Sequence, residues 1–294
     1  MASNQPLGAK IKAHLVELET THHSALQQKL KDDAPKYPSV EVTLLLGDFK
    51  EHSKAVFATI HTDQYAFCFI DPFGFQCVDL GFISDLMKSR ARINGGRTEL
   101  FITLMTRHLN WFLTDEVKRP LWDKIFGTTE WQKLANETHR IEKVVGLYCN
   151  QIQLAAADVG LKAWVYPIGI KPDSDQAEMY YLIHVGFHPK ARLVMEQSVA
   201  KIPQLEIAQL DLFGIVPVMD EIVAILKREP KLNALELGGE VWLKEPKANW
   251  KDLIIPALKR LESDKTITVI AYNGRKRRDG IEEKDFVKLT NETK

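Results

Sequence analysis

The segment Ala66-Phe67-Cys68-Phe69-Ile70-Asp71-Pro72-Phe73-Gly74 decides the fold of this chain. Residues 66–70 are apolar throughout, and an acid, a proline and a glycine come directly after them. A short apolar run that stops abruptly is typical of a strand buried on both faces of a parallel sheet. We therefore expect a buried parallel strand over 66–70, with 71–74 lying beyond its carboxyl end.

Strands and helices alternate on the amino-terminal side of this segment. The pattern of apolar residues predicts a strand over 13–17, a helix over 19–31, a strand over 40–46 and a helix over 51–60. Strands joined by helices of this length form parallel sheets with right-handed crossovers. The first part of the chain is therefore predicted to be an α/β fold.

Each of these strands is followed by an acidic side chain. Glu17, Asp48 and Asp71 stand at the three successive carboxyl ends. Ligands of open α/β sheets bind beyond the carboxyl ends of the strands, so the three acids would line one binding rim. The alternative is structural, because an acid after a strand often caps the next helix.

The chain continues with a different kind of strand pairing. We expect helices over 78–90 and 137–159 and a strand over 99–105, with short helices between 111 and 130. The strands predicted over 162–168 and 180–187 are joined by a polar turn, which favours an antiparallel pair. A mostly parallel sheet with an antiparallel end pair is the architecture of Rossmann-like methyltransferases.

The composition of the tail differs from that of the rest of the chain. Helices are predicted over 218–227 and 249–262, followed by strands over 266–271 and 286–289. Four cations lie between these strands: Arg275, Lys276, Arg277 and Arg278. Two helices and a hairpin with a basic tip are typical of a winged helix that contacts phosphates. A solvated basic turn and a protein-docking domain are the alternatives.

Composition excludes several classes of protein. Among 294 residues, 39 are Lys or Arg and 39 are Asp or Glu, so no overall positive charge points to nucleic acid. Three cysteines without metal-ligand spacing favour neither disulfides nor zinc, and we expect a reduced, cytoplasmic protein without a membrane span. The expected organisation is a frayed or tag-like stretch 1–10, a methyltransferase-like domain 11–212 and a winged-helix-like domain 213–294.

Several short motifs together resemble one bacterial family. These motifs are His14-Leu15-Val16-Glu17-Leu18-Glu19, Leu46-Gly47-Asp48-Phe49, Phe69-Ile70-Asp71-Pro72-Phe73-Gly74, Phe101-Ile102-Thr103-Leu104 with Arg107, and Tyr180-Tyr181-Leu182-Ile183-His184. Over residues 11–200 the chain resembles the three-Cys-motif partner proteins, which are methyltransferase-like. The resemblance implies S-adenosylmethionine as the cofactor and a three-Cys-motif radical-enzyme-like protein as a partner.

The resemblance also implies roles for individual residues on the cofactor. Glu17, with Glu19 in reserve, would accept hydrogen bonds from the ribose hydroxyls, a role that suits an ionised carboxylate. Asp48 would accept from the adenine amino group, and Phe49 would cover the adenine ring. Independently of the resemblance, Arg107 follows the strand next to Asp71 and would either hold a substrate phosphate or pair with Asp71.

Asp71, Pro72 and Phe73 stand where related enzymes present an acid-Pro-Pro-aromatic element to an exocyclic amine. Here Phe73 replaces the second proline and Gly74 replaces the aromatic residue. The family also begins with a strand and a glycine-rich turn, whereas only Leu7-Gly8-Ala9 precedes the first predicted strand. Without that central strand two sheet edges would stay unpaired. Either the sequence is truncated, or the sheet closes differently and leaves no such edges.

Two functions follow from these observations. The first is an S-adenosylmethionine-dependent methyltransferase, or a degenerate relative, that acts on nucleic acid, with Glu17 and Asp48 on the cofactor and residues 71–73 at the methyl acceptor. The second is a non-catalytic partner protein that keeps the fold and binds nucleic acid or protein. Trp122, Trp131 and Trp164 are expected to pack in the core or against loops and not to stack on bases, and the histidines lack metal-ligand spacing.

Overall fold

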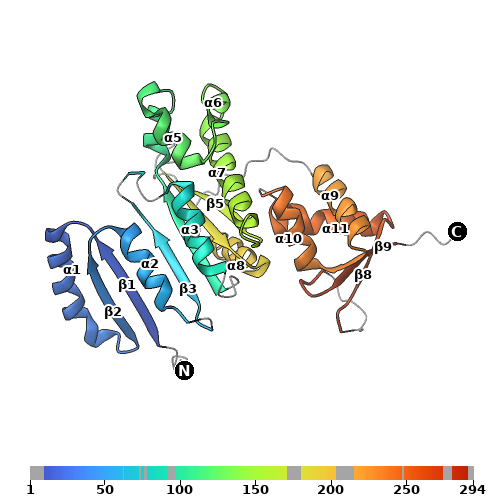
Figure 1. The fold of residues 1–294 in the computed structure, drawn as a ribbon. Helices are drawn as coiled ribbons and strands as arrows, with labels where there is room; N and C mark the ends of the chain where they lie inside the picture. The colour runs from blue at the N-terminus through green and yellow to red at the C-terminus, as the bar shows by residue number, and fades with distance from the viewer. Residues whose placement is uncertain are drawn as a thin grey trace. The chain divides into compact units, whose positions relative to one another are not determined.

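The protein is a mixed α/β protein, as its sequence predicts (Figure 1). A computed structural model describes residues 10–61, 63–72, 74–75, 78–91, 97–170, 180–202, 215–246, 248–273 and 280–290. The chain forms two compact units, Met1–Gln64 and Tyr65–Lys294. The domain boundary expected at 212/213, and residues 1–9 of the stretch 1–10 that was expected to be frayed or tag-like, lie outside the described residues.

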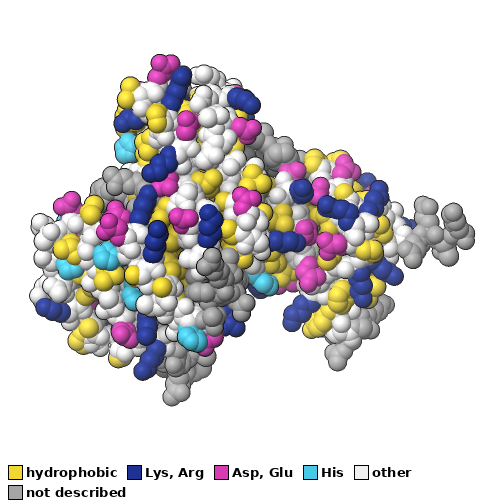
Figure 2. Space-filling model, in the orientation of Figure 1, with side chains coloured by type: hydrophobic (Ala, Val, Ile, Leu, Met, Phe, Trp, Pro, Cys, Tyr) yellow, Lys and Arg dark blue, Asp and Glu magenta, His cyan; other side chains and the backbone are white. Residues whose placement is uncertain are grey.

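Charged side chains of both signs are interspersed over the face drawn in Figure 2. This distribution agrees with the equal numbers of cationic and acidic residues in the sequence. In the part of the chain that the structure describes, no helix combines the length and the apolar character that crossing a bilayer requires.

The first unit contains a parallel two-stranded sheet. Its elements are β1 (Ile11–Glu17), α1 (Thr20–Asp33), β2 (Val40–Leu46) and α2 (Phe49–Thr59). The strands pair in register from Ile11 opposite Val40 to Glu17 opposite Leu46. Because they run in the same direction, their carboxyl ends lie at the same edge of the sheet. The parallel pairing predicted for these two strands is thus confirmed.

The second unit is built on a four-stranded sheet in the order β3-β4-β6-β5. These strands are β3 (Ala66–Ile70), β4 (Thr98–Leu104), β5 (Trp164–Ile170) and β6 (Tyr180–Gly186). β3 and β4 are parallel, whereas β6 is antiparallel to both β4 and β5. The predicted antiparallel pair is confirmed, and its second strand lies inside the sheet, between β4 and β5.

In the described part of the chain, six α-helices accompany this sheet. They are α3 (Leu80–Ala91), α4 (Thr106–Phe112), α5 (Arg119–Phe126), α6 (Trp131–Leu134), α7 (Arg140–Ala157) and α8 (Pro189–Val199). α3 and α7 pack against each other, and α7 and α8 both pack against β5. Val199 of α8 shares a buried cluster with Tyr166 and Ile168 of β5. Helix α8 was not predicted from the sequence.

The expectation that residues 66–70 are buried on both faces is wrong. Cys68 and Ile70 are buried, but Phe67 and Phe69 are 65% and 52% exposed. Side chains alternate between the two faces of a strand, so one face of β3 is covered and the other is open. β3 is an edge strand of its sheet, whereas α8 packs against β5 and β6, away from that edge.

Among its described residues, the C-terminal part of the second unit contains three α-helices and a three-stranded antiparallel sheet. Its elements are α9 (Ile215–Arg228), β7 (Lys231–Asn233), α10 (Ala234–Lys244), a π-helical turn Trp250–Ile254 that continues in α11 (Ile255–Ser263), β8 (Ile267–Ile270) and β9 (Phe286–Leu289). The sheet has the order β7-β9-β8. The prediction of two helices and a hairpin was incomplete, because β7 and α10 were missed.

A local signal for α10 is present in the sequence. The side chain of Asn233 accepts a hydrogen bond from the backbone of Glu236, and the Glu236 carboxylate accepts one from the backbone of Asn233, which forms a capping box. Gly238 and Gly239 make the helix hard to predict, because each glycine in a helix interior lowers helix stability by about 1 kcal/mol relative to alanine. Packing compensates this cost.

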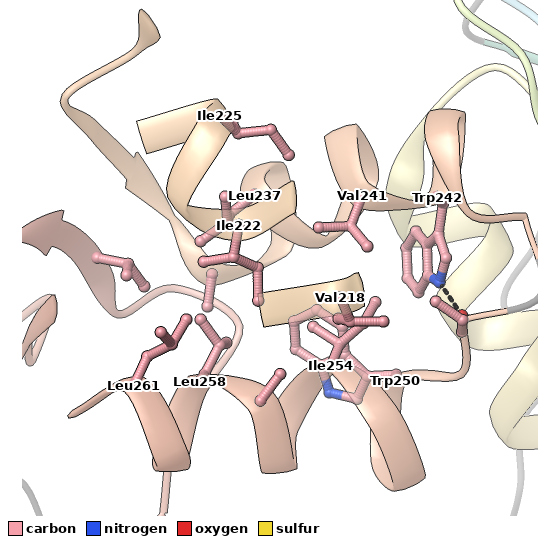
Figure 3. Close-up of a cluster of buried hydrophobic side chains, with 14 of the residues drawn as sticks. Val218, Ile222, Ile225, Leu237, Val241, Trp242, Trp250, Ile254, Leu258 and Leu261 are labelled. Carbon is pink, nitrogen blue, oxygen red and sulfur yellow. Dashed lines mark hydrogen bonds between the residues drawn. The ribbon is translucent and has the colours of Figure 1, made fainter. Parts of the chain in front are cut away.

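A large apolar core holds the C-terminal elements together (Figure 3). Trp242 and Trp250 lie in contact in this core, with ring centroids 5.8 Å apart. The Trp242 indole donates to the carbonyl oxygen of Ala248 at 2.6 Å, drawn as the dashed line in Figure 3. Trp164 of β5 and Leu193 of α8 belong to the same core. The C-terminal elements are therefore packed directly onto the four-stranded sheet.

Buried polar side chains fix this packing. Arg192 is 1% exposed and donates to the carbonyl oxygens of Val165 and Pro246. Glu196 accepts a hydrogen bond from the backbone nitrogen of Trp250 at 2.7 Å. Burial lowers the pKa of Arg192 to about 10 and raises the pKa of Glu196 above its ordinary value. Both side chains belong to α8, so this helix connects the sheet to the C-terminal core.

Gly238→Ala should destabilise the protein. A Cβ atom at position 238 would lie 2.4 Å from a ring carbon of Trp250, whose ring is held against Trp242. We expect a loss of about 1–3 kcal/mol in the free energy of unfolding. The matched control is Gly146→Ala in α7, where a Cβ meets nothing within 4 Å and the gain should reach about 1 kcal/mol. Equal effects of both substitutions in urea unfolding would contradict this packing.

Glu196 should make stability depend on pH. Because burial raises its pKa in the folded state, the folded protein keeps this proton to a higher pH than the unfolded chain does. Its stabilising contribution is therefore present at acid pH and is lost as the pH rises through the folded pKa. From pH 4.5 upward, the free energy of unfolding of the wild type should fall relative to that of Glu196→Gln. Parallel stability curves, measured by urea unfolding, would refute the burial of an ionisable Glu196.

Candidate functional site

The first unit places Glu17 at the carboxyl end of β1. The backbone carbonyl of Glu17 accepts a hydrogen bond from Gly47 at 3.0 Å, which ties the end of β1 to the end of β2. Its carboxylate oxygen Oε1 accepts from the backbone nitrogen of Glu19 at 2.9 Å and lies 3.9 Å from Nδ1 of His22. Glu17 thus presents a partly exposed carboxylate at this edge.

Asp48 lies at the same edge, just beyond β2. Its Oδ1 atom accepts a hydrogen bond from the backbone nitrogen of Lys50 at 2.6 Å, so Asp48 caps α2. Phe49 is the first residue of that helix. Two carboxylates therefore stand at the carboxyl ends of two adjacent parallel strands, as predicted. The helix-capping alternative holds for Asp48 at the same time.

His52 is a neighbour that the sequence did not single out. Its Nε2 atom lies 2.9 Å from the carbonyl oxygen of Leu46, in the last position of β2. Gly47 has a φ of 138°, and a Cβ atom there would lie 2.7 Å from Nε2 of His52. The glycine is required because the imidazole lies against the backbone. The Gly-Asp pair after an apolar strand was the signal for this turn.

The second unit places Asp71 beyond the carboxyl end of β3. The Asp71 side chain is exposed, and Pro72 is partly buried. Phe73 lies outside the described residues. Gly74 has a φ of 87°, a conformation that favours glycine, and Phe75 then packs edge-on against Trp122 at 4.9 Å between ring centroids. This turn therefore points Phe75 back into the protein and leaves Asp71 outside.

Arg107 does not pair with Asp71 among the described residues, so that alternative is wrong. Arg107 follows the end of β4, and its guanidinium carbon lies 5.2 Å from the ring centroid of Trp111. β3 and β4 are parallel neighbours, so Asp71 and Arg107 follow strand ends at the same edge of the sheet. The cation is held by an aromatic ring and not by the acid.

The candidate residues fall into two groups. Glu17 and Asp48 belong to the first unit, whereas Asp71 and Arg107 belong to the second. Each pair stands at the carboxyl edge of its own sheet. The grouping of the three acids on one rim stays a prediction. The basic residues of the expected wing, 275–278, lie outside the described residues.

His184, for which no specific role was predicted, is a buried histidine that pairs with a partly exposed acid, Glu99. The ring is completely buried, and Nε2 lies 2.8 Å from Oε2 of Glu99 on the neighbouring strand. The hydrogen bond from His184 holds the pKa of the Glu99 carboxyl below its usual range. Among the described residues, no cluster of His, Cys, Asp and Glu could hold a metal ion.

The three tryptophans expected in the core are buried. Trp122, Trp131 and Trp164 are 1%, 2% and 7% exposed. Each indole nitrogen donates a hydrogen bond, to the carbonyl of Phe112, the carboxylate of Asp123 and the carbonyl of Gly239, respectively. This confirms their structural role and excludes them as surfaces for stacking.

No protein-family model matches the chain, and no curated protein matches it. The chain is similar to a solved structure described as "The structure of PKMT2 from Rickettsia typhi". The alignment has 10% sequence identity and a TM-score of 0.25, and it covers 88% of this chain and 69% of the other. A likeness of this size carries no argument about function, which must come from the geometry of the site.

Proposed function

We propose that this chain is a Rossmann-like methyltransferase, or a degenerate relative of one, that acts on nucleic acid. The observation that carries the proposal is the order of strands in the second unit. An antiparallel strand, β6, lies between β4 and β5, next to a parallel pair β3-β4. A parallel sheet that ends in such an inserted antiparallel strand is the arrangement of Rossmann-like methyltransferases.

The parallel pair β1-β2 supports the same proposal. In that fold, the second and third strands each end in an acid that accepts hydrogen bonds from the cofactor. Glu17 and Asp48 are acceptors at two adjacent strand ends, which suits ribose hydroxyls and an adenine amino group. Each carboxylate already accepts one backbone hydrogen bond and has the capacity for more.

S-adenosylmethionine would supply the transferable methyl group, and this chain would hold and orient it. The carboxylates of Glu17 and Asp48 fit the nucleoside part of the cofactor, whose hydroxyl and amino groups are hydrogen-bond donors. Asp71 would stand at the acceptor side of the second unit, followed by Pro72 and Phe73. An exposed carboxylate there could accept hydrogen bonds from an exocyclic amine.

Cofactor binding is the direct test of this proposal. We expect S-adenosylmethionine and S-adenosylhomocysteine to give heat on titration into folded protein. Glu17→Gln should weaken both by about tenfold, because it loses a charge-assisted acceptor. Glu41→Gln is a matched control, since Glu41 is an exposed acid near the amino-terminal start of β2, at the other end of the strands from Glu17. No heat with either ligand, or equal losses in both variants, would contradict the assigned role.

A second candidate function is a non-catalytic partner protein that binds nucleic acid or protein. It is favoured by the C-terminal element order α9-β7-α10-α11-β8-β9 and by the sheet order β7-β9-β8. Three helices and a three-stranded sheet in this arrangement are typical of a winged helix. The basic segment 275–278 would be its wing, between β8 and β9. A three-Cys-motif radical-enzyme-like protein is the proposed protein partner.

The wing can be tested by charge. Replacing Arg275, Lys276, Arg277 and Arg278 by Gln should weaken duplex DNA binding and flatten its dependence on salt. Each phosphate contact removed should lower the slope of log K against log salt by about 0.9. The measurement is fluorescence anisotropy at several salt concentrations. An unchanged slope would indicate that these residues form a solvated turn that makes no contact with DNA phosphates.

A further inference from the structure

Helix α4 carries a cluster of exposed aromatic and basic side chains at the carboxyl edge of the four-stranded sheet. Trp111 is 57% exposed and Phe112 is 41% exposed. The other five of the six tryptophans in the sequence are at most 8% exposed. Large aromatic side chains stabilise a protein by being buried, so an exposed Trp-Phe pair in one short helix is evidence of a binding surface.

Basic or imidazole side chains flank both rings. The guanidinium of Arg107 lies 5.2 Å from the Trp111 centroid, and the ring of His108 meets Trp111 edge-on at 5.4 Å. The Nζ atom of Lys118 lies 5.9 Å from the centroid of Phe112. Exposed cation–π contacts are weak, about 0.5–1 kcal/mol, so a ligand can readily take their place.

The acids of this segment do not neutralise these cations. Asp115 uses its carboxylate to cap the turn at Val117, and Glu116 pairs with Arg119 at 3.0 Å. In the described part of the chain, no carboxylate lies within ion-pair distance of Arg107 or Lys118. Residues 107–118 therefore offer two exposed aromatic rings, each with a cation beside it that lacks an acidic partner among the described residues.

The helix that carries these rings is rigidly held. Arg140 of α7 donates to Oδ1 and to the carbonyl oxygen of Asn110, at 2.8 and 2.9 Å. The buried indole of Trp122 donates to the carbonyl oxygen of Phe112 at 3.0 Å. Leu109 and Leu113 are completely buried beneath the surface. A fixed backbone lowers the entropic cost of ordering these side chains when a ligand binds.

We infer that Arg107, Trp111, Phe112 and Lys118 form a binding surface for single-stranded nucleic acid. Successive bases stack on Trp111 and Phe112, and the phosphates between them contact Arg107 and Lys118. Ring faces beside cations match unpaired bases beside phosphates, because every base has a π-face that any aromatic ring can accept. A duplex buries those faces, and an acidic peptide would leave the exposed rings without partners.

This inference names the substrate class of the proposed function and rests on it for its biological meaning. Its location supports the connection, because α4 begins directly after β4, the neighbour of the strand that leads to Asp71. The binding itself requires no cofactor. Experiments can therefore contradict the methyltransferase proposal and the nucleic-acid surface independently of each other.

The test is titration of the full chain with fluorescently labelled oligothymidylate, followed by anisotropy. Trp111→Ala should weaken binding about tenfold or more, and Trp111→Phe should restore most of the affinity because stacking is retained. Tryptophan fluorescence should be quenched in the wild type, since Trp111 is the exposed tryptophan. Arg107→Ala should also lower the slope of log K against log salt by about 0.7.

A matched control exists at the opposite edge of the same sheet. Tyr65 is 81% exposed with the guanidinium of Arg97 5.5 Å from its ring, so it has the same chemistry before β3. Tyr65→Ala should leave oligothymidylate affinity unchanged. Circular dichroism and thermal unfolding establish that each variant is folded.

Three results would overturn the inference. They are no oligothymidylate binding by the folded wild type, equal binding by Trp111→Ala, and tighter binding of duplex DNA or polyglutamate than of oligothymidylate at this surface. Failure of S-adenosylmethionine to bind in calorimetry would contradict the methyltransferase proposal and leave this surface standing.

Discussion

The hydrogen bonding of β6 on both sides is the interaction on which the second unit depends. β6 pairs with β4 along one edge and with β5 along the other, so its backbone groups are used in two ladders. This pairing places β5 at one edge of the sheet and leaves β3 at the other. It also positions α8 over β5 and β6, where Arg192 and Glu196 connect the sheet to the C-terminal core. The sheet, α8 and the C-terminal helices therefore depend on one another.

Strand direction decides where chemistry can occur. Parallel strands bring their carboxyl ends to one edge, and each unit uses that edge for polar side chains. Glu17 and Asp48 stand at the edge of the first unit, while Asp71 and the cluster around Trp111 stand at the edge of the second. The carboxylate acceptors at the edge of the first unit suit a nucleoside, whereas the exposed rings and cations at the edge of the second unit suit unpaired bases. The two edges therefore differ in their chemistry.

Local patterns predicted most elements but not their surroundings. The strand Ala66–Ile70 was located correctly, yet the open face around Phe67 and Phe69 depends on its position at the sheet edge, which no local pattern contains. Helix α10 was missed because Gly238 lowers its helix propensity, and that glycine is explained only by the ring of Trp250. Glu17 and Asp48 follow directly from strand ends. No role was predicted for Trp111, because only its exposure distinguishes it from the other tryptophans and the sequence alone does not show which side chains are exposed.

Hydrogen exchange measured by mass spectrometry, with and without S-adenosylhomocysteine, tests the central claim most directly. If the carboxyl edge of the first unit holds the nucleoside, peptides covering residues 17–20 and 47–50 should exchange more slowly with the ligand present. Protection should be largest there because the ligand contacts Glu17 and Asp48 and stabilises the adjacent helix starts. Unchanged exchange in these peptides at saturating ligand, or protection confined to residues 215–289, would contradict the assignment.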